Sequence, residues 1–412
     1  MSERELALSR TKLVGLFIGI DLALFLSAVD QTILNTAVPR MAAEFGDFDL
    51  GPWIITAYLL MCTVVTPLAG KLADTVGTKR ALAWATGLFV AASMLCGMAT
   101  SFAFLIAARA VQGVGGGAMI SLCFISIGEL FTARERGKYQ GILAAAFIVA
   151  AIIGPALGGW LADHKLWRWV FYINVPLGLV ASICLALFFP RVERISKEKG
   201  TKIFPRELFN STLVNISLVT VFVTGMGLFS GSLVLALLFQ ETYHTNAAQS
   251  GYALTPLMLL VALASIAGGL LISRTGRYKI ICIAGLVLMS VGAVQLALIN
   301  AQSPLYAVFV GAGVSGLGLG LLLPVHAIVV QNSVDRSVLG VATSMTQLFR
   351  SLGGTIGTGL LSGFLALLLK THSMQMSLTT VLMIYAVTLC GTTLLNFFMP
   401  EVELKTKQAR LP

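Results

Sequence analysis

Residues 109–118 read RAVQGVGGGA, so that an arginine and a glutamine precede four glycines within five positions. Apolar residues flank this stretch, and together they predict a membrane-spanning helix over residues 103–130 that carries a cation into the bilayer. Gly113 and Gly117 have the spacing that lets a second helix approach closely. We therefore expect the glycines to form a packing surface. A phosphate-binding loop is not indicated, because no strand precedes the stretch and no Gly-Lys-Ser/Thr follows it.

The chain has the composition of a polytopic membrane protein. Of its 412 residues, 57% are hydrophobic and 11% are charged, and the mean hydropathy is +0.89. Soluble domains contain about 25% charged residues. We predict an all-α fold with twelve transmembrane helices arranged as two six-helix bundles. The predicted spans are 12–39, 52–70, 81–100, 103–130, 139–161, 169–190, 211–240, 250–272, 279–299, 304–331, 339–369 and 376–399.

The distribution of Lys and Arg predicts the orientation in the membrane. An even number of spans puts both termini on one side, and the termini and loops of that side hold 22 of the 28 Lys and Arg residues, against four on the other. Such residues accumulate in cytoplasmic loops, so we expect both termini in the cytoplasm. The same bias explains the net charge of +10 without a nucleic-acid partner. Trp53, Trp160, Trp167 and Trp169 fall near the predicted outer boundary, as in an aromatic belt.

A polar segment in the middle of the chain separates two related halves. We predict an N-terminal bundle over 1–190, a cytoplasmic linker over 191–210 and a C-terminal bundle over 211–412. The loop GKLADTVGTKR at 70–80 has a weaker counterpart, GLLISRTGRYK, at 269–279. Repeats of this kind are typical of transporters, whose substrate sites lie near the bilayer midplane.

Residues 70–80 resemble motif A of the major facilitator superfamily. Thr75 and Thr78 stand where that motif usually has basic residues. We expect Asp74 to cap the N-terminus of a following helix, to pair with the basic loop at 134–138 and to act as a conformational lock. The residues that match motif A, which the resemblance assigns to conformational gating, are Gly70, Leu72, Ala73, Asp74, Gly77, Lys79 and Arg80.

Further motifs resemble the same superfamily and, within it, a drug:proton antiporter family usually built with fourteen helices. Arg109, Gln112 and Gly113 resemble motif B, and DQTILNTAVP at 30–39 and WRWVFYINVPLG at 167–178 are similar to stretches of the antiporter family. This chain has only about twenty polar residues where that family inserts two extra helices. The residues that resemble motif C, which implies that the two halves touch and rock there, are Gly141, Gly154, Pro155, Gly158 and Gly159.

Charged side chains inside the bilayer indicate a function, because each costs roughly 2.5–3.5 kcal/mol to insert. We expect Asp30 to face a cavity and to carry the coupling proton, with Arg109 biasing its proton affinity and Asp21 as a second candidate. Nine residues of straight helix put Asp21 and Asp30 on opposite faces. The candidate substrate-binding residues are Asp30, Gln112, Gln347, Arg350 and His326.

The resemblance implies a proton-coupled antiporter that exports small hydrophobic or cationic compounds by alternating access, as in multidrug efflux. Its expected partners are the substrate, protons and membrane lipid, with no cofactor beyond the proton gradient, no metal and no nucleic acid. A monomer in the bacterial cytoplasmic membrane is expected. Two alternatives remain open: a dedicated exporter of a lipid, siderophore or metabolite, and a membrane receptor that has lost transport. An enzyme is not indicated, because we find no nucleophile–base pair, metal cluster or cofactor motif.

Overall fold

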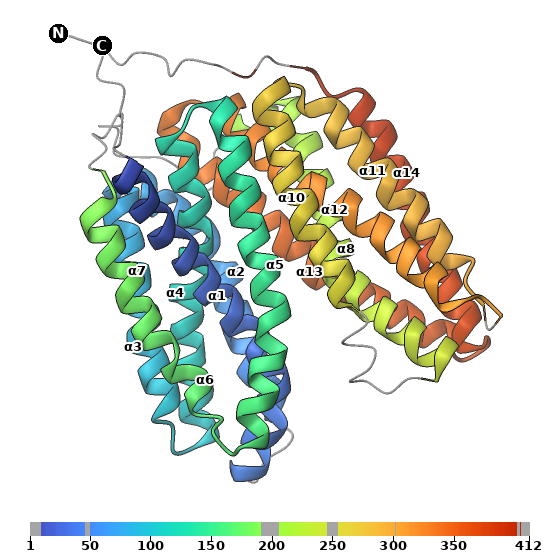
Figure 1. Cartoon of the computed structure of the whole chain (residues 1–412), viewed down its shortest axis with the longest axis horizontal. Coiled ribbons are helices and arrows are strands. Elements are labelled where there is room, and N and C mark those ends of the chain that lie inside the picture. Colours follow the sequence, from blue (N-terminus) through green and yellow to red (C-terminus); the bar gives the residue numbers. More distant parts are fainter. Residues whose placement is uncertain are drawn as a thin grey trace. The chain divides into compact units, whose positions relative to one another are not determined.

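The computed structural model describes residues 10–45, 50–190, 206–244, 254–300, 302–401 and 404. The secondary structure of these residues is helical, with no strand among them. The helices (Figure 1) are α1 (Arg10–Phe45), α2 (Gly51–Val76), α3 (Thr78–Gly97), α4 (Phe102–Leu130), α5 (Ala133–Asp163), α6 (Trp169–Tyr172), α7 (Asn174–Phe188), η1 (Arg206–Asn210), α8 (Thr212–Tyr243), α10 (Thr255–Thr275), α11 (Tyr278–Ala297), α12 (Leu305–Ser333), η2 (Arg336–Val338), α13 (Leu339–Leu368) and α14 (Met374–Phe397).

Twelve helical segments among the described residues are long and apolar enough to cross a membrane, and α6 and α7 together form the sixth. The predicted all-α fold with twelve transmembrane helices is confirmed. The expected start of one span at residue 250 lies outside the described residues. The protein is an integral membrane protein, and the part of the chain that the structure describes supplies twelve spans.

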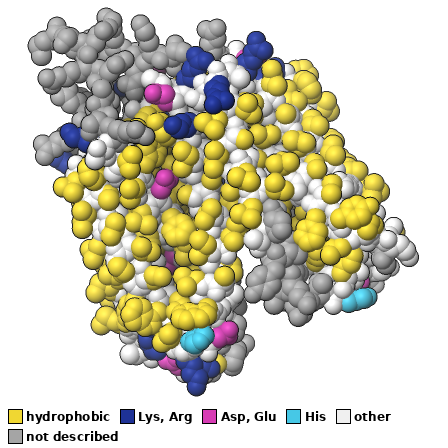
Figure 2. All heavy atoms as spheres, in the orientation of Figure 1, with side chains coloured by type: hydrophobic (Ala, Val, Ile, Leu, Met, Phe, Trp, Pro, Cys, Tyr) yellow, Lys and Arg dark blue, Asp and Glu magenta, His cyan; other side chains and the backbone are white. Residues whose placement is uncertain are grey.

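The exposed side chains of the helices are those of a protein in lipid. Val387 is 71% exposed and Phe398 is 79% exposed. Figure 2 shows hydrophobic side chains covering the flanks of the helices, with Lys and Arg towards the ends. Soluble proteins rarely expose contiguous apolar surface on this scale, whereas a bilayer requires it.

One predicted member of the aromatic belt is buried. Trp53, Trp160 and Trp169 are exposed, as side chains at a membrane boundary would be, but Trp167 is only 1% exposed. The Trp167 indole donates from Nε1 to Glu44 Oε2 over 2.6 Å. The prediction was therefore wrong for Trp167, because position near a boundary does not determine which way a ring turns.

The fold consists of two compact units. Unit 1 comprises residues Met1–Ser126, Ala150–Ile203 and Arg336–Ser344, and in it α7 packs against α1 and α3. Unit 2 comprises Ile127–Val149, Phe204–Asp335 and Met345–Pro412, and in it α12 packs against α10 and α11. Most of the expected linker at 191–210 lies outside the described residues. The boundaries 1–190 and 211–412 remain predictions.

The glycines of α4 form the packing surface expected for them. A Cβ atom at Gly113 would overlap the backbone of Tyr58, and one at Gly117 would overlap the backbone of Cys62, so both glycines lie against α2. Gly115 lies equally close to the backbone of Phe89 in α3. The glycines thus let three helices approach closely around the segment that carries Arg109.

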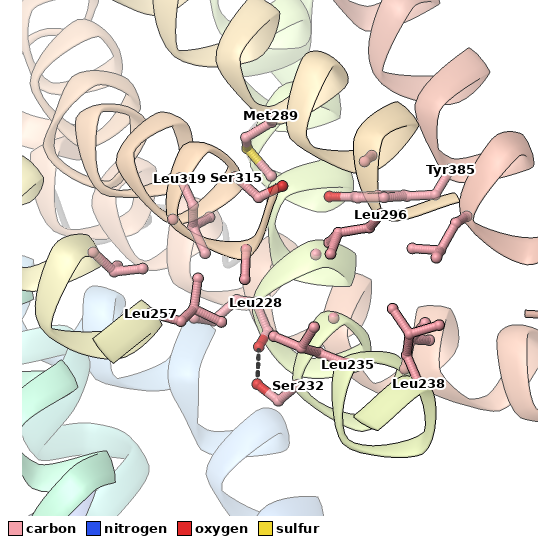
Figure 3. Close-up of a pocket in the computed structure, with 18 of the residues that line it drawn as sticks. Leu228, Ser232, Leu235, Leu238, Leu257, Met289, Leu296, Ser315, Leu319 and Tyr385 are labelled. Carbon is pink, nitrogen blue, oxygen red and sulfur yellow. Dashed lines mark hydrogen bonds between the residues drawn. The ribbon is translucent and has the colours of Figure 1, made fainter. Parts of the chain in front are cut away.

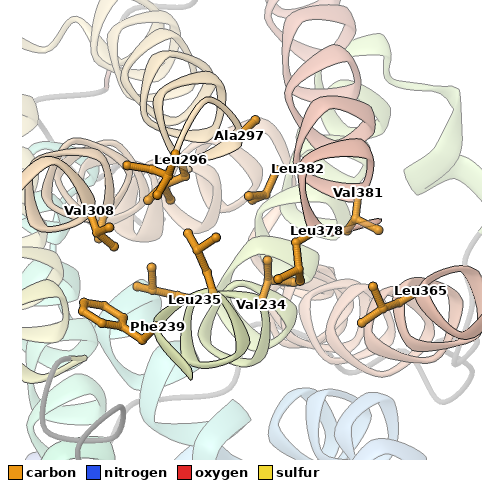
Figure 4. Packing of buried hydrophobic residues seen from close by; sticks show 13 residues of the cluster. Val234, Leu235, Phe239, Leu296, Ala297, Val308, Leu365, Leu378, Val381 and Leu382 are labelled. Carbon is orange, nitrogen blue, oxygen red and sulfur yellow. The ribbon is translucent and has the colours of Figure 1, made fainter. Parts of the chain in front are cut away.

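An apolar cluster closes one end of unit 2. It joins the last turns of α8, α11 and α13 to the first turns of α12 and α14 (Figure 4). Leu235 and Phe239 of α8 pack there with Leu296, Val308 and Leu378. This cluster holds the ends of five helices of unit 2 together largely through apolar contacts.

Candidate functional site

A buried polar cluster lies inside unit 1 and centres on an ion pair. Arg109 Nη1 donates to Asp30 Oδ2 over 2.5 Å, and the two side chains are 1% and 0% exposed. The same Nη1 donates to Gln112 Oε1 over 2.6 Å. Gln112 Nε2 in turn donates to Asp30 Oδ1 over 2.8 Å. The three residues therefore form a closed ring of contacts between α1 and α4.

Further helices complete the cluster. Asn174 Nδ2, at the start of α7, donates to Asp30 Oδ1 over 3.1 Å. Ser93 Oγ of α3 accepts from Gln112 Nε2 over 2.7 Å and from Asn174 Nδ2 over 3.3 Å. Asp30 is thus bound by donors from two other helices, α4 and α7.

The α2 side of the cluster is formed by Tyr58 and the backbone of Ile54. Arg109 Nε donates to the Ile54 carbonyl oxygen over 3.3 Å. The guanidinium carbon lies 4.1 Å from the centroid of the Tyr58 ring, a favourable position for a cation over an aromatic face. The Tyr58 hydroxyl lies 3.1 Å from Ser27 Oγ, which donates to the Gly116 carbonyl. Arg109 therefore has partners besides Asp30.

The structure brings together three of the residues predicted from the sequence: Asp30, Arg109 and Gln112. The expectation that Asp30 faces an open cavity was wrong, because neighbouring helices of unit 1 cover its side chain completely. Asp21 is not a partner of Asp30. It is half-buried, and its Oδ1 atom is buried without a hydrogen-bond partner. The functional roles of all four residues remain predictions.

Three members of the cluster, Asn174, Ser93 and Tyr58, were not predicted from the sequence. Asn174 lies in the stretch 167–178 that resembles the antiporter family, and it is an amide in an otherwise apolar span. That signal could have identified it. Ser93 and Tyr58 carry no such signal, because serine and tyrosine are common in spans without binding anything.

The predicted residues of the second half lie in unit 2 and are incompletely paired. Arg350 donates from Nη1 to Gln347 Oε1 over 3.2 Å and from Nη2 to the Leu323 carbonyl over 3.3 Å. Arg350 Nε, Gln347 Nε2 and His326 Nδ1 are buried without a partner. The ion pairs found in the described part of the chain do not include Arg350. Buried unpaired polar atoms are rare in proteins and indicate a strained or functional place.

Asp74, for which we predicted a gating role, caps a helix far from it in sequence. Its Oδ1 accepts from the Gly340 N–H over 2.9 Å and its Oδ2 from the Val341 N–H over 3.0 Å. These groups begin α13, so the carboxylate lies at a helix N-terminus, where negative charge is favoured. The helix that α2 precedes directly, α3, has no side-chain cap. Gly77, with φ of +95°, allows the turn between them.

Unit 2 contains a related contact at the corresponding loop. Arg134 of the basic loop donates to the carbonyl oxygens of Ser273 and Arg274, over 2.8 and 2.6 Å. These carbonyls end α10, where a cation is favoured. Gly137 and Gly269 lie in close backbone contact there, as Gly70 and Gly340 do in unit 1. In the first loop of the sequence repeat Asp74 thus binds the N-terminus of α13, whereas in the second loop the carbonyl oxygens that end α10 are themselves bound by Arg134.

The glycines that resemble motif C divide between the units. A Cβ at Gly154 would overlap Thr32, and one at Gly158 would overlap the Ile33 carbonyl, so both lie against α1 in unit 1. Gly141 lies against Ser265 in unit 2, and a Cβ at Gly159 would meet nothing. The Pro155 carbonyl accepts from Thr36 Oγ1 over 3.3 Å. The gating role remains a prediction for all the residues to which we assigned it: Gly70, Asp74, Gly77, Arg80, Gly154, Pro155, Gly158 and Gly159.

Comparison with known proteins identifies the family. The family model described as Major Facilitator Superfamily matches residues 20–358 and, in a second match, residues 217–410. The multidrug transporter protein MdtP of Bacillus subtilis is 34% identical, with 85% of this chain and 75% of MdtP covered. The uncharacterised transporter Rv1877 of Mycobacterium tuberculosis is 31% identical, with 83% of this chain and 58% of that protein covered.

Solved structures agree on the fold. The proton:xylose symporter XylE superposes with a TM-score of 0.77 at 16% identity, covering 96% of this chain and 98% of XylE. The human organic anion transporter MFSD10 gives a TM-score of 0.73 at 16% identity, covering 94% of this chain and 99% of MFSD10. The chain belongs to the Major Facilitator Superfamily and is a membrane transporter.

Proposed function

We propose that the protein is a proton-coupled antiporter that exports small hydrophobic compounds, cationic ones included, by alternating access. The observation that supports this most is the buried cluster of Asp30, Arg109, Gln112 and Asn174. A buried ion pair is expensive to place in a membrane protein and marks proton relays and ion pathways. The name of the relative MdtP, a multidrug transporter, favours export of drug-like compounds.

Proton uptake at Asp30 is the coupling step of this proposal. A neutral Asp30 would lose most of its attraction for Arg109, whose guanidinium has alternative partners in the Ile54 carbonyl and the Tyr58 ring. The contacts between α1, α4 and α7 would then weaken, because all three pass through the Asp30 carboxylate. Proton binding and the arrangement of these helices would therefore be linked.

Gln347, Arg350 and His326 form the proposed substrate contacts of unit 2, while Asp30 and Gln112 are those of unit 1. The protein would work in the bacterial cytoplasmic membrane with both termini in the cytoplasm, as its loop charges favour. It would act as a monomer, and it would need protons and surrounding lipid but no cofactor.

A second function is favoured by one observation, the unpaired donors Arg350 Nε and Gln347 Nε2. These atoms would bind a hydrogen-bond acceptor such as a carboxylate or carbonyl. A dedicated exporter of an acidic lipid, a siderophore or a similar metabolite would present such a group. Acidic and cationic compounds of equal size therefore discriminate between the two functions.

The experiment that tests the proposal uses proteoliposomes with an imposed pH gradient. Uptake of the lipophilic cation ethidium is followed for the parent, Asp30→Asn and Asp21→Asn, all checked for folding by size-exclusion elution. We expect gradient-driven uptake by the parent and by Asp21→Asn, and none by Asp30→Asn. Uptake by Asp30→Asn equal to the parent would refute coupling through Asp30. If the folded parent transports an acidic dye and not ethidium, the dedicated exporter is favoured.

A further inference from the structure

A cavity lies among five helices of unit 2: α8, α10, α11, α12 and α14 (Figure 3). It contains about 650 Å³ of space not occupied by atoms, including the part that is open to its surroundings. Its walls are almost wholly apolar, and no charged side chain contributes to them. It is built from residues of unit 2 alone, and none of them belongs to the polar groups described above.

The few polar atoms in the wall are largely engaged. Ser232 Oγ donates to the carbonyl of Leu228 in its own helix over 3.2 Å, a contact drawn in Figure 3. The Tyr385 hydroxyl donates to the Val223 carbonyl over 3.3 Å. Water needs two to four polar partners to occupy a cavity. This cavity therefore offers little to water or to a polar ligand.

One glycine faces the empty space directly. A Cβ atom at Gly231 of α8 would meet no atom within 4 Å, although five helices surround the cavity. Beyond it, Val234, Leu235, Leu296 and Leu382 line the cavity and also belong to the apolar cluster of Figure 4. The cavity is thus closed at the end of unit 2 where that cluster lies.

We propose that this cavity binds a slender uncharged apolar group, such as an alkyl chain or a single aromatic ring. Apolar cavities in proteins remain dry and accept apolar guests of matching size. The thioethers of Met258 and Met289 in the wall can adapt to guests of different shape. The absence of charge from the wall excludes a charged headgroup. The guest is either the acyl chain of a bilayer lipid or a free hydrophobic compound dissolved in the bilayer.

The proposal is tested by photolabelling of the full chain in phosphatidylcholine nanodiscs. Two probes are used in parallel: 3-trifluoromethyl-3-(m-iodophenyl)diazirine, which is a free apolar ring, and a phosphatidylcholine with a diazirine in its acyl chain. Adducts are mapped by mass spectrometry. Met289 is the readout because it lines the cavity and is buried, and Val387 normalises the yield because it is exposed on α14.

The variants fill the cavity or add the same bulk elsewhere. Gly231→Phe places a ring in the empty space, and Ala312→Leu narrows the cavity from α12. Gly391→Phe is the matched control, because Gly391 is an exposed glycine of α14 whose Cβ would also meet nothing. Asp30→Asn separates this proposal from proton coupling, since it should leave the labelling of Met289 unchanged.

We expect Met289 adducts in the parent, in Gly391→Phe and in Asp30→Asn, and their loss in Gly231→Phe and Ala312→Leu. Loss of the free-ring adduct alone identifies a dissolved compound as the guest, and loss of the lipid adduct alone identifies an acyl chain. Adducts at Met289 that are equal in all folded variants, or absent from the parent with both probes, would overturn the proposal. If Gly231→Phe does not fold, the yield of Met289 adducts in Ala312→Leu tests the proposal in its place.

Discussion

The interiors of the two units differ in what fills them. Unit 1 encloses an ion pair whose Asp30 carboxylate also accepts from the amides of Gln112 and Asn174, and glycines of α4 bring its helices into backbone contact. Unit 2 encloses apolar space among five helices and leaves Arg350 Nε and Gln347 Nε2 without a hydrogen-bond partner. The related halves therefore differ in what their interiors offer: a paired charge in unit 1, and apolar space with unpaired donor atoms in unit 2.

Removing the cation of unit 1 should have the largest effect. Arg109→Gln leaves Asp30 buried beside weaker partners, and breaking a buried pair in this way costs about 3–5 kcal/mol. We expect a large fall in the thermal unfolding temperature in detergent, and no transport. The double variant Asp30→Asn/Arg109→Gln should recover much of the stability and none of the transport. A single variant as stable as the parent would contradict the importance of the ion pair.

Replacing a glycine by alanine should lower the stability of the protein in unit 1 and raise it in unit 2. Gly113→Ala forces a Cβ onto the α2 backbone, and overpacking of this kind costs about 1–3 kcal/mol. Gly231→Ala enters empty space in a helix, where alanine is favoured over glycine by roughly 0.5–1 kcal/mol. We expect the first variant to unfold at a lower temperature than the parent and the second at a higher one. If both variants shift the unfolding temperature by the same amount in the same direction, the two interiors do not differ in packing as described.

Neutralising the cation of unit 2 should change stability little. Arg350→Met removes a half-buried charge that has no acidic partner in the described part of unit 2, so the lost hydrogen bonds are offset by a smaller desolvation cost. We expect the free energy of unfolding to change by about 1 kcal/mol or less, as measured by denaturant titration. Substrate affinity should fall nonetheless. A loss of stability as large as that of Arg109→Gln would show that Arg350 has a structural charge partner.

The ion pair at the exposed end of unit 1 should have the smallest effect. A hydrogen bond from Trp167, and then one from Arg168, lower the pKa of Glu44 below its ordinary value of 4.5. The stabilisation is therefore present above pH 4.5 and is lost as pH falls through the lowered pKa. Because both side chains of the pair are partly exposed, Glu44→Gln should cost about 0.2–1 kcal/mol at pH 7. The stability of the variant and that of the parent should become equal in acid. A difference in stability that persists there would show that this ion pair does not cause it.

The number of spans and the residues Asp30, Arg109 and Gln112 were predictable from the sequence. Helix length and apolar content are properties of a single segment. A charged residue inside such a segment can be recognised from the sequence without knowing the direction of its side chain. The close packing at Gly113 and Gly117 was predictable for the same reason, because their spacing within one helix fixes a common face.

Only the tertiary structure decided which helices meet. It brought Asn174 and Ser93 to Asp30, turned Trp167 inward and gave Asp74 the N-terminus of α13 to cap. It also left a cavity beside Gly231. Each of these contacts depends on the rotation and depth of one helix relative to another. The hydrophobicity of a single segment places it in the bilayer but does not determine either quantity, because both are set by packing against neighbouring helices.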